Sequence, residues 1–403
     1  MKKYLLLLLA AHFSFGQIPA NYYNTTTGLS GYALKTQLKK IIDDANDGLT
    51  PEYLHIDRGY GSGSSQTNNG LWSAYGTTDR DNGIGYDNDN TIVDIYTEIP
   101  SGADVHNFNF NTELGANEGQ CGSTNSPNYV VEGDCYNREH LIPKSYFGDF
   151  QPMLTDVQHV YPTDGKVNAI HNDYAFGKVN IASYTSTNGS KLGTATNSGY
   201  AAGFSGTVFE PIDEFKGDVA RVYLYFATRY EDQMASFYTT YTGVDCRVMF
   251  DGTSNQVFSP TFLNILIAWH KIDPVSTKEI VRNNAAFVHQ NNRNPYIDHP
   301  EFICQMWPSQ CAAVDVMLSS ETFLADNAVS IYPNPTNTNE VEIFTTENIT
   351  KLSLVSINGQ IIKDIENPIF NQNTYKLNNL PQGFYFLQIS AENGSLTKKI
   401  IVN

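Results

Sequence analysis

The sequence predicts an α+β protein in which a mainly helical domain with an embedded strand–strand–helix motif is followed by a small β-sandwich. Three observations support this prediction. Apolar residues recur at helical spacing in several segments between residues 33 and 290. A strand-like run that ends near Pro143 is followed by a helix start at Asp164. Beyond residue 328 the pattern changes to short alternating strands separated by turns.

Length, composition and charge narrow the class of protein. The 403 residues are enough for two folded units with processing segments, and a hydrophobic content of 41% is ample for a packed core. A formal net charge of −17 argues against a protein that coats nucleic acid through a general positive field. An acidic enzyme that holds phosphates locally would depend on metal ions or on salt.

The N-terminus has the pattern of a secretory signal peptide over residues 1–16. Two lysines precede a mostly apolar run from Tyr4 to Phe15, and Gly16 ends a small-x-small cleavage site. The run is too short to cross a bilayer, and no later segment approaches ~20 apolar residues. We therefore expect an exported protein that begins at Gln17 and does not span a membrane.

Export makes disulfide bonds chemically possible. The chain has five cysteines, which cannot all pair within one molecule. Cys121 with Cys135, and Cys304 with Cys311, would each close a short loop and leave Cys246 free. Spacing alone does not fix this connectivity, and buried free thiols are the alternative.

Several segments of the first domain have helical periodicity and recognisable ends. One helix is expected to follow Pro211 and Asp213, after a Gly-, Ser- and Thr-rich stretch at residues 183–206. Ser276 and Glu279 have the spacing of a capping box at the start of another. The predicted helices cover residues 33–45, 213–230, 262–270 and 276–290, and Thr91–Ile99 alternates like a strand.

A polar, Asp-rich segment precedes that predicted strand. The run of Asp79, Asp81, Asp87 and Asp89 resembles a loose calcium loop, although it lacks the ordered spacing and the terminal glutamate of an EF-hand. A structural cation and a solvated turn are the two interpretations, and the solvated turn is favoured.

Residues suited to catalysis are concentrated in Cys135–Pro143 and in Asp156–Asn172. Glu139 and His140 are neighbours, and in a regular strand their side chains would point to opposite faces. For both to serve one site the strand must end or bend there, which the following proline supports.

A helix start downstream completes this arrangement. Asp164 has the position of an N-cap, and Asn168 would lie one turn inside the helix. Oxygen ligands from Glu139 and Asn168 suit a hard ion such as Mg²⁺. A neutral His140 could take a proton from an attacking water, so the pattern fits metal-assisted phosphodiester cleavage.

Basic residues are available to hold phosphate groups. Arg138, Lys144 and Lys166 lie within or beside the two segments, and Arg221 or Arg229 could join them through the fold. Arg221 and Arg229 are eight residues apart and so share one side of a helix, where internal ion pairing is the alternative to phosphate contact.

These residues closely resemble bacterial endonuclease I, a group of secreted or periplasmic nucleases of the ββα-metal (His-Me finger) type. The resemblance covers most of residues 20–308 and consists of ordered islands. They are residues 134–140, 143–145, 156, 159, 162–168, 172–174, 209–218, 220–221, 269–271, 273–276 and 292–300.

The resemblance implies a role for each matching position. His140 would be the general base, and Glu139 and Asn168 would ligate the metal. The family cleaves DNA, and often RNA, with little sequence preference. Gln158 stands before His159 where the family commonly has a pair of histidines, which leaves the general base untouched.

The C-terminal module resembles the sorting domain of type IX secretion cargo. The resemblance rests on Tyr332-Pro333-Asn334-Pro335, the Asn358-Gly359 hairpin, Leu380–Tyr385 and the basic-apolar end, with Asn393-Gly394 as a second hairpin signal. It implies a second export step across an outer membrane. The alternative is a generic sugar-binding or adhesive sandwich.

The sequence therefore predicts a signal peptide (1–16), an endonuclease I-like catalytic domain (17–318), a linker (319–328) and a sorting domain (329–403). The expected function is a secreted or cell-surface, monomeric endonuclease that hydrolyses DNA, and also RNA. It would use Mg²⁺ or another divalent cation such as Ca²⁺ or Mn²⁺, with His140, Arg138 and Arg221 as catalytic residues. The alternative is an exported binding or adhesive protein with a degenerate nuclease fold.

Overall fold

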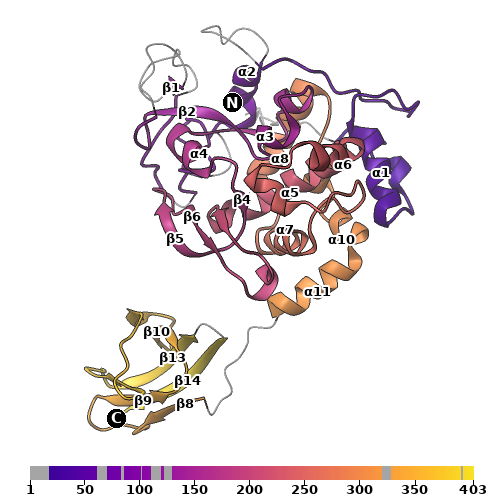
Figure 1. Ribbon diagram of the computed structural model, residues 1–403. Helices are drawn as coiled ribbons and strands as arrows, with labels where there is room; N and C mark the ends of the chain where they lie inside the picture. The colour runs from indigo at the N-terminus through magenta and orange to yellow at the C-terminus, as the bar shows by residue number, and fades with distance from the viewer. Residues whose placement is uncertain are drawn as a thin grey trace, which may run out of the picture. The chain divides into compact units, whose positions relative to one another are not determined.

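The computed structural model describes residues 18–60, 70–82, 86–100, 102–109, 119–121, 129–319, 328–391 and 394–403. The chain divides into two compact units, Met1–Asp315 and Val316–Asn403 (Figure 1). Helices and sheets together form the first unit, and strands form most of the second, so the α+β class is confirmed. Within the described ranges, every helix is too short or too polar to cross a bilayer.

The core of the first unit is organised around α5 (Asp213–Arg229), which runs through its middle (Figure 1). Almost every residue of this helix is buried, as expected of a helix that other elements cover on all sides. α5 packs against α7 (Pro260–Ile272) and α1 (Gly31–Ile42), and α8 (Thr277–Gln290) packs against α2 (Leu71–Thr78).

The remaining helices begin in this unit, and most of them have ten residues or fewer. They are α3 (Lys144–Phe147), α4 (Gly165–His171), α6 (Glu231–Thr240), α9 (Pro295–Asp298), α10 (Phe302–Met306) and α11 (Pro308–Ser319). Among the residues that the structure describes, four 3₁₀ turns accompany them, at Asn24–Thr26, Met153–Thr155, Gly199–Ala201 and Asp245–Met249.

The helices predicted from periodicity are confirmed as α1, α5, α7 and α8, with ends shifted by a few residues. At the start of α8, the Ser276 side chain accepts a hydrogen bond from the Glu279 amide, and the Glu279 carboxylate accepts one from the Ser276 amide. This is the predicted capping box. At the start of α7, the Ser259 hydroxyl accepts from the Phe262 amide, directly before Pro260.

The described part of the first unit also contains two small sheets. In one, β1 (Gly119–Gln120) runs parallel to β2 (Cys135–His140), which runs antiparallel to β3 (Val160–Asp164). The other has the order β4-β7-β6-β5, formed by Ala175–Phe176, Thr207–Glu210, Lys191–Ala195 and Val179–Thr185. Part of the Gly-, Ser- and Thr-rich stretch is therefore paired in a sheet, which its composition did not indicate.

The prediction of a strand over Thr91–Ile99 is wrong. The described segment contributes one β-bridge, between Arg80 and Ile92, and then turns. Asp94 accepts hydrogen bonds from the Tyr96 amide (2.9 Å) and the Thr97 hydroxyl (2.6 Å). These local side-chain bonds compete with strand pairing and hold the segment in a turn.

Both predicted disulfide pairings are confirmed. Cys121 is bonded to Cys135, fourteen residues away, and Cys304 to Cys311, while Cys246 is free and buried. The first disulfide joins the end of β1 to the first residue of β2. It also packs on the start of α4, where a Cβ atom at Gly165 would overlap Cys121 Sγ.

The second unit consists of two sheets that share one hydrophobic cluster. One has the order β11-β10-β13-β14, formed by Ile361–Glu366, Ile349–Ser356, Gly383–Ala391 and Gly394–Val402. The other has the order β12-β9-β8, formed by Thr374–Leu377, Val341–Thr345 and Val329–Tyr332. The predicted turn at Asn358-Gly359 joins β10 to β11, with Gly359 at a φ of +83°. Asn393 and the predicted signal peptide lie outside the described residues.

Candidate active site

A polar pocket of about 340 Å³ lies beside the end of β2. It brings together four of the five predicted site residues, which are Arg138, Glu139, His140 and Asn168. Tyr60, Asn137, Pro143, Lys144, Ser145, Asn172 and Asp173 complete its lining. The fifth predicted residue, Arg221, is not in this lining.

Two partners fix the position of Glu139. Its Oε1 accepts a hydrogen bond from the Tyr96 hydroxyl (2.9 Å) and lies 2.7 Å from His171 Nδ1. Among the described residues, none donates a hydrogen bond to Oε2. One oxygen of this carboxylate is therefore held by the protein while the other is available to the pocket.

Sequence reasoning missed both of these partners. His171 lies three residues after Asn168 on α4, and this i,i+3 spacing was the signal that could have identified it. Tyr96 comes from the segment interpreted as a strand, and its position next to Glu139 depends on a turn that the alternation pattern concealed.

His140 is held in one orientation by a backbone carbonyl. Its Nε2 lies 3.0 Å from the carbonyl oxygen of Leu154. Because a carbonyl oxygen only accepts hydrogen bonds, Nε2 carries the proton in the neutral ring and Nδ1 carries the lone pair. Burial, together with nearby His159, keeps the pKa of His140 well below its usual range, so the ring is a neutral base.

Asn168 is positioned by the start of α4. β3 ends at Asp164, whose side chain caps the helix by accepting from the amides of Lys166 (2.7 Å) and Val167 (2.9 Å). The Asp164 amide in turn donates to Asp94 Oδ2 at 2.8 Å. The N-cap and the helix predicted here are confirmed, and Asn168 lies one turn inside, at the pocket.

Arg138 reaches the pocket between two aromatic rings. Its guanidinium carbon is 3.5 Å from the centre of the Tyr60 ring and 4.3 Å from that of Trp72, and Nη1 donates to the Tyr60 carbonyl oxygen at 2.7 Å. Trp72 is buried and forms a T-shaped ring contact with Tyr136. These contacts restrict the guanidinium to one face of the pocket.

The groups around Arg221 indicate that this residue stabilises the fold. Its side chain is fully buried and forms two hydrogen bonds to Glu279, Nε to Oε1 at 2.6 Å and Nη2 to Oε2 at 2.7 Å. Nη1 donates to the carbonyl oxygen of Asp273 at 2.8 Å. The geometry therefore gives no support to the predicted catalytic role of Arg221 and assigns it to an internal ion pair.

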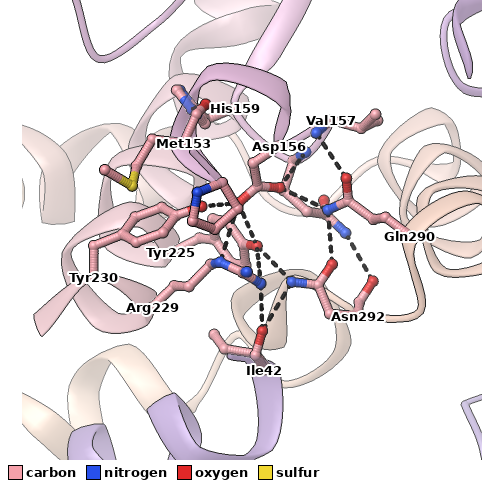
Figure 2. A network of polar contacts seen from close by, with 12 residues as sticks. Ile42, Met153, Asp156, Val157, His159, Tyr225, Arg229, Tyr230, Gln290 and Asn292 are labelled. Carbon is pink, nitrogen blue, oxygen red and sulfur yellow. Dashed lines mark hydrogen bonds and ion pairs between the residues drawn. The ribbon is translucent and has the colours of Figure 1, made fainter. Parts of the chain in front are cut away.

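Asp156 and Arg229 belong to a second buried network, outside the pocket lining (Figure 2). The Asp156 carboxylate accepts from the hydroxyls of Tyr225 (2.8 Å) and Tyr230 (2.7 Å) and from Gln290 Nε2 (2.6 Å). Arg229 Nε lies 3.4 Å away. Although burial opposes it, this arginine lowers the pKa of Asp156 below its usual range. The network ties α5 to the segment that precedes β3.

Comparisons with known proteins define the class of protein. Residues 30–301 match the family model for endonuclease I, and residues 330–403 match that for the secretion system C-terminal sorting domain. The first match covers more than half of the chain, so the chain belongs to the endonuclease I family. It is a nuclease that is secreted or displayed at the cell surface.

Two curated relatives cover most of the chain. An extracellular ribonuclease of Bacillus amyloliquefaciens is 31% identical over 291 residues, which is 71% of this chain and 78% of the relative. An extracellular ribonuclease of Bacillus subtilis (strain 168) is 30% identical over 308 residues, which is 75% of this chain and 84% of the relative. A structure from work on PorZ of Porphyromonas gingivalis matches 19% of this chain and 12% of its own, at 17% identity and a TM-score of 0.17, too low to indicate a shared fold.

Proposed function

We propose that this protein is a metal-dependent endonuclease that hydrolyses phosphodiester bonds of DNA and RNA with little sequence specificity. The observation that carries the proposal is the neutral His140, oriented by the Leu154 carbonyl group so that Nδ1 is a free base, beside Glu139 and Asn168 in one polar pocket. Its membership of a nuclease family supports the same conclusion.

The donor set of the pocket fits a hard divalent cation. Glu139 Oε2 and the Asn168 amide oxygen are oxygen ligands, and Glu139 is held through its other oxygen by Tyr96 and His171. Mg²⁺ takes few protein ligands and keeps several waters, for which this pocket has room, and Mn²⁺ or Ca²⁺ would accept the same donors. When bound, such an ion would offset the charge on the phosphate and the leaving oxygen.

The protein residues then have distinct roles. His140 Nδ1 takes a proton from water while the water oxygen bonds to phosphorus and the bond from phosphorus to O3′ breaks, and the released O3′ takes a proton from a solvent water. This general-base step contributes roughly 10²–10⁴-fold. Arg138 and Lys144 hold phosphate oxygens at the pocket, and the contact with Leu154 keeps the imidazole in the required tautomer.

Attack by water accounts for activity on both nucleic acids. Because the nucleophile is not the 2′-hydroxyl of the substrate, the mechanism does not distinguish RNA from DNA. The relatives named extracellular ribonucleases support activity on RNA. The products would carry a 5′-phosphate and a 3′-hydroxyl. A 2′,3′-cyclic phosphate on RNA fragments would contradict attack by water.

The central experiment compares His140→Ala with the wild type on plasmid DNA and on RNA in the presence of Mg²⁺. We expect the rate to fall roughly 10²–10⁴-fold on both substrates, with little change in Tm. His289→Ala, on α8 and outside the pocket, is the matched control and should cleave normally. EDTA should abolish activity and added divalent cation should restore it.

Two results would contradict the proposal. Wild-type cleavage rates in His140→Ala would show that His140 is not the general base. A folded mature protein that cleaves neither DNA nor RNA with Mg²⁺, Mn²⁺ or Ca²⁺ would favour an exported binding or adhesive protein.

We also propose a two-step export route for a monomeric enzyme. Residues 1–16 would direct the chain across the inner membrane, and residues 329–403 would direct it across the outer membrane through the type IX machinery, with 17–318 as the catalytic domain and 319–328 as the linker. The match of the C-terminal residues to a sorting domain supports the second step. N-terminal sequencing of the exported protein should find Gln17, and deletion of residues 329–403 should retain the nuclease inside the cell.

A further inference from the structure

One short turn of the backbone holds two histidines, of which one is the proposed base. The turn is the 3₁₀ segment Met153–Thr155. Nε2 of His140 lies 3.0 Å from the Leu154 carbonyl oxygen, and Nε2 of His159 lies 2.6 Å from the Met153 carbonyl oxygen. The centres of the two imidazole rings are 5.6 Å apart, with an angle of 64° between the rings. The orientation of the base therefore depends on where this turn lies.

His159 packs against His140 as a neutral ring. It is fully buried, and its Nδ1 has no hydrogen-bond partner among the described residues. Burial lowers the pKa of His159 to about 4. The ring also packs on Phe147 and Phe226, with ring centres 5.9 Å and 4.9 Å away. His159 thus supports one side of the base without adding a charge to it.

Asp156 anchors the end of this turn. It follows the turn directly and is fully buried. Its carboxylate accepts hydrogen bonds of 2.6–2.8 Å from the hydroxyls of Tyr225 and Tyr230 and from Nε2 of Gln290 (Figure 2). Its carbonyl oxygen accepts from the His159 amide at 3.0 Å. The backbone that carries both carbonyl acceptors is therefore tied to the ends of α5 and α8.

The negative charge of Asp156 balances a buried arginine. Arg229 is only 2% exposed, and its Nε lies 3.4 Å from Oδ2 of Asp156. Within the described part of the chain, Nε and Nη2 of Arg229 have no hydrogen-bond partner. Loss of the carboxylate charge would leave the guanidinium buried without a counter-charge, which is strongly unfavourable. The side chains around it would then rearrange, and the turn would move with them.

We propose that Asp156 is a positioning residue for the nuclease reaction, acting on His140 through the Met153–Thr155 turn and the Leu154 carbonyl group. Asp156 lies outside the lining of the pocket, so its effect passes through the backbone. With the turn in place, the ring keeps its proton on Nε2 and presents the lone pair of Nδ1 to water. This inference rests on the proposed role of His140 as the general base.

The first test compares kcat with KM for Asp156→Asn in the full mature chain. We expect kcat on plasmid DNA with Mg²⁺ to fall roughly 10–100-fold, because a misplacement of about 1 Å can cost about 10²-fold. KM should stay close to the wild-type value, since the phosphate contacts at the pocket are kept.

Asp298→Asn is the matched control. The Asp298 side chain is 4% exposed, and it likewise accepts from a tyrosine hydroxyl (Tyr23, 2.7 Å) and from an arginine (Arg293 Nε, 2.6 Å). This variant should also lower Tm. At a temperature where both variants are folded, its kcat should remain close to that of the wild type.

Nitrogen-15 NMR of His140 supplies a readout that a loss of stability alone would not change. The chemical shifts of the two ring nitrogens show which of them carries the proton, and the His140 signals are assigned by their absence in His140→Ala. In the wild type and in Asp298→Asn we expect a protonated Nε2 and an unprotonated Nδ1. In Asp156→Asn the two shifts should move toward each other, because the tautomers mix.

Tyr230→Phe is a milder variant, because it removes one donor and leaves the carboxylate beside Arg229. Its kcat should fall about 10-fold, with the same direction of change in the nitrogen shifts. Unchanged shifts in folded Asp156→Asn, or in Tyr230→Phe if Asp156→Asn does not fold, would overturn the inference. So would an equal loss of kcat in Asp298→Asn. The shifts do not depend on cleavage, so they decide this inference even if His140→Ala cleaves normally and the proposed function fails.

Discussion

The function of a single side chain in this pocket is set by the groups that flank it. The Leu154 carbonyl group accepts a hydrogen bond from Nε2–H of His140, and the ring of Tyr60 lies nearly parallel to the imidazole, at an angle of 20°. The same tyrosine contacts the Arg138 guanidinium with its ring and its carbonyl oxygen. Tyr60 thus connects the proposed base to the proposed phosphate ligand.

Replacement of Tyr60 tests this connection. Tyr60→Ala should reduce kcat/KM roughly 10-fold, because a cation–π contact worth about 0.5–2 kcal/mol and the ring beside His140 are both lost. Tyr60→Phe is the matched control. It keeps the ring and the backbone carbonyl group, and so should cleave at close to the wild-type rate. Equal losses in the two variants would show that the hydroxyl, and not the ring, is what matters.

Arg221 is a residue at which stability and catalysis can be separated. Arg221→Met leaves Glu279 buried without its partner, which should cost about 3–5 kcal/mol of stability. At a temperature where the variant is folded, kcat should remain within a few-fold of the wild type. Arg138→Met should instead lower kcat in plasmid assays and leave the Tm in thermal melts close to that of the wild type. A large loss of kcat with unchanged Tm in Arg221→Met would restore a catalytic role.

At the scale of elements, β2, β3 and α4 form one strand–strand–helix group around the Cys121–Cys135 disulfide. The disulfide holds the start of β2, and the end of that strand carries Glu139 and His140. Gly165 opens α4 directly against Cys121 Sγ and the Cys135 carbonyl oxygen, so strand and helix approach more closely than any side chain would permit.

A methyl group at Gly165 should therefore disturb the packing of β2, β3 and α4 together. We expect Gly165→Ala to destabilise the protein by about 1–3 kcal/mol through overpacking, measured by denaturant unfolding. Gly243→Ala, where nothing lies within 4 Å of the added Cβ, should be nearly neutral. The penalty at Gly165 should shrink when both cysteines are replaced by alanine, because the overlapping sulfur is gone. A penalty independent of the cysteines would assign it to the backbone instead.

The elements that sequence reasoning predicted well are those determined locally. The capping box of α8 and the N-cap of α4 depend on residues three positions apart, so their signals are complete within one turn. The turn at Asp94 and the pairing of β5 with β6 depend on partners that composition and alternation do not reveal. In the pocket, Glu139, His140 and Asn168 could be predicted, whereas Tyr96 and Tyr60 come from distant segments and required the fold.

At the scale of the whole molecule, the net charge of −17 opposes the binding of a polyanion. Attraction to nucleic acid must then come from a few local contacts, and at the pocket these are Arg138 and Lys144. Lys144 is also 2.9 Å from Asp149, an exposed pair that a phosphate could displace at little cost.

The salt dependence of binding measures how many such contacts exist. For His140→Ala, which binds without cutting, the slope of log K against log salt concentration on duplex DNA should be roughly −2, because each phosphate contact contributes about −0.9. Lys144→Ala should reduce the slope by about 1, whereas Lys40→Ala, on the exposed face of α1, should leave it unchanged. The slope is obtained by measuring binding by fluorescence anisotropy at salt concentrations from about 50 to about 200 mM. A slope near −6 would mean that a broad basic surface, and not this pocket, holds the substrate, because two cations at one pocket cannot release that many counterions.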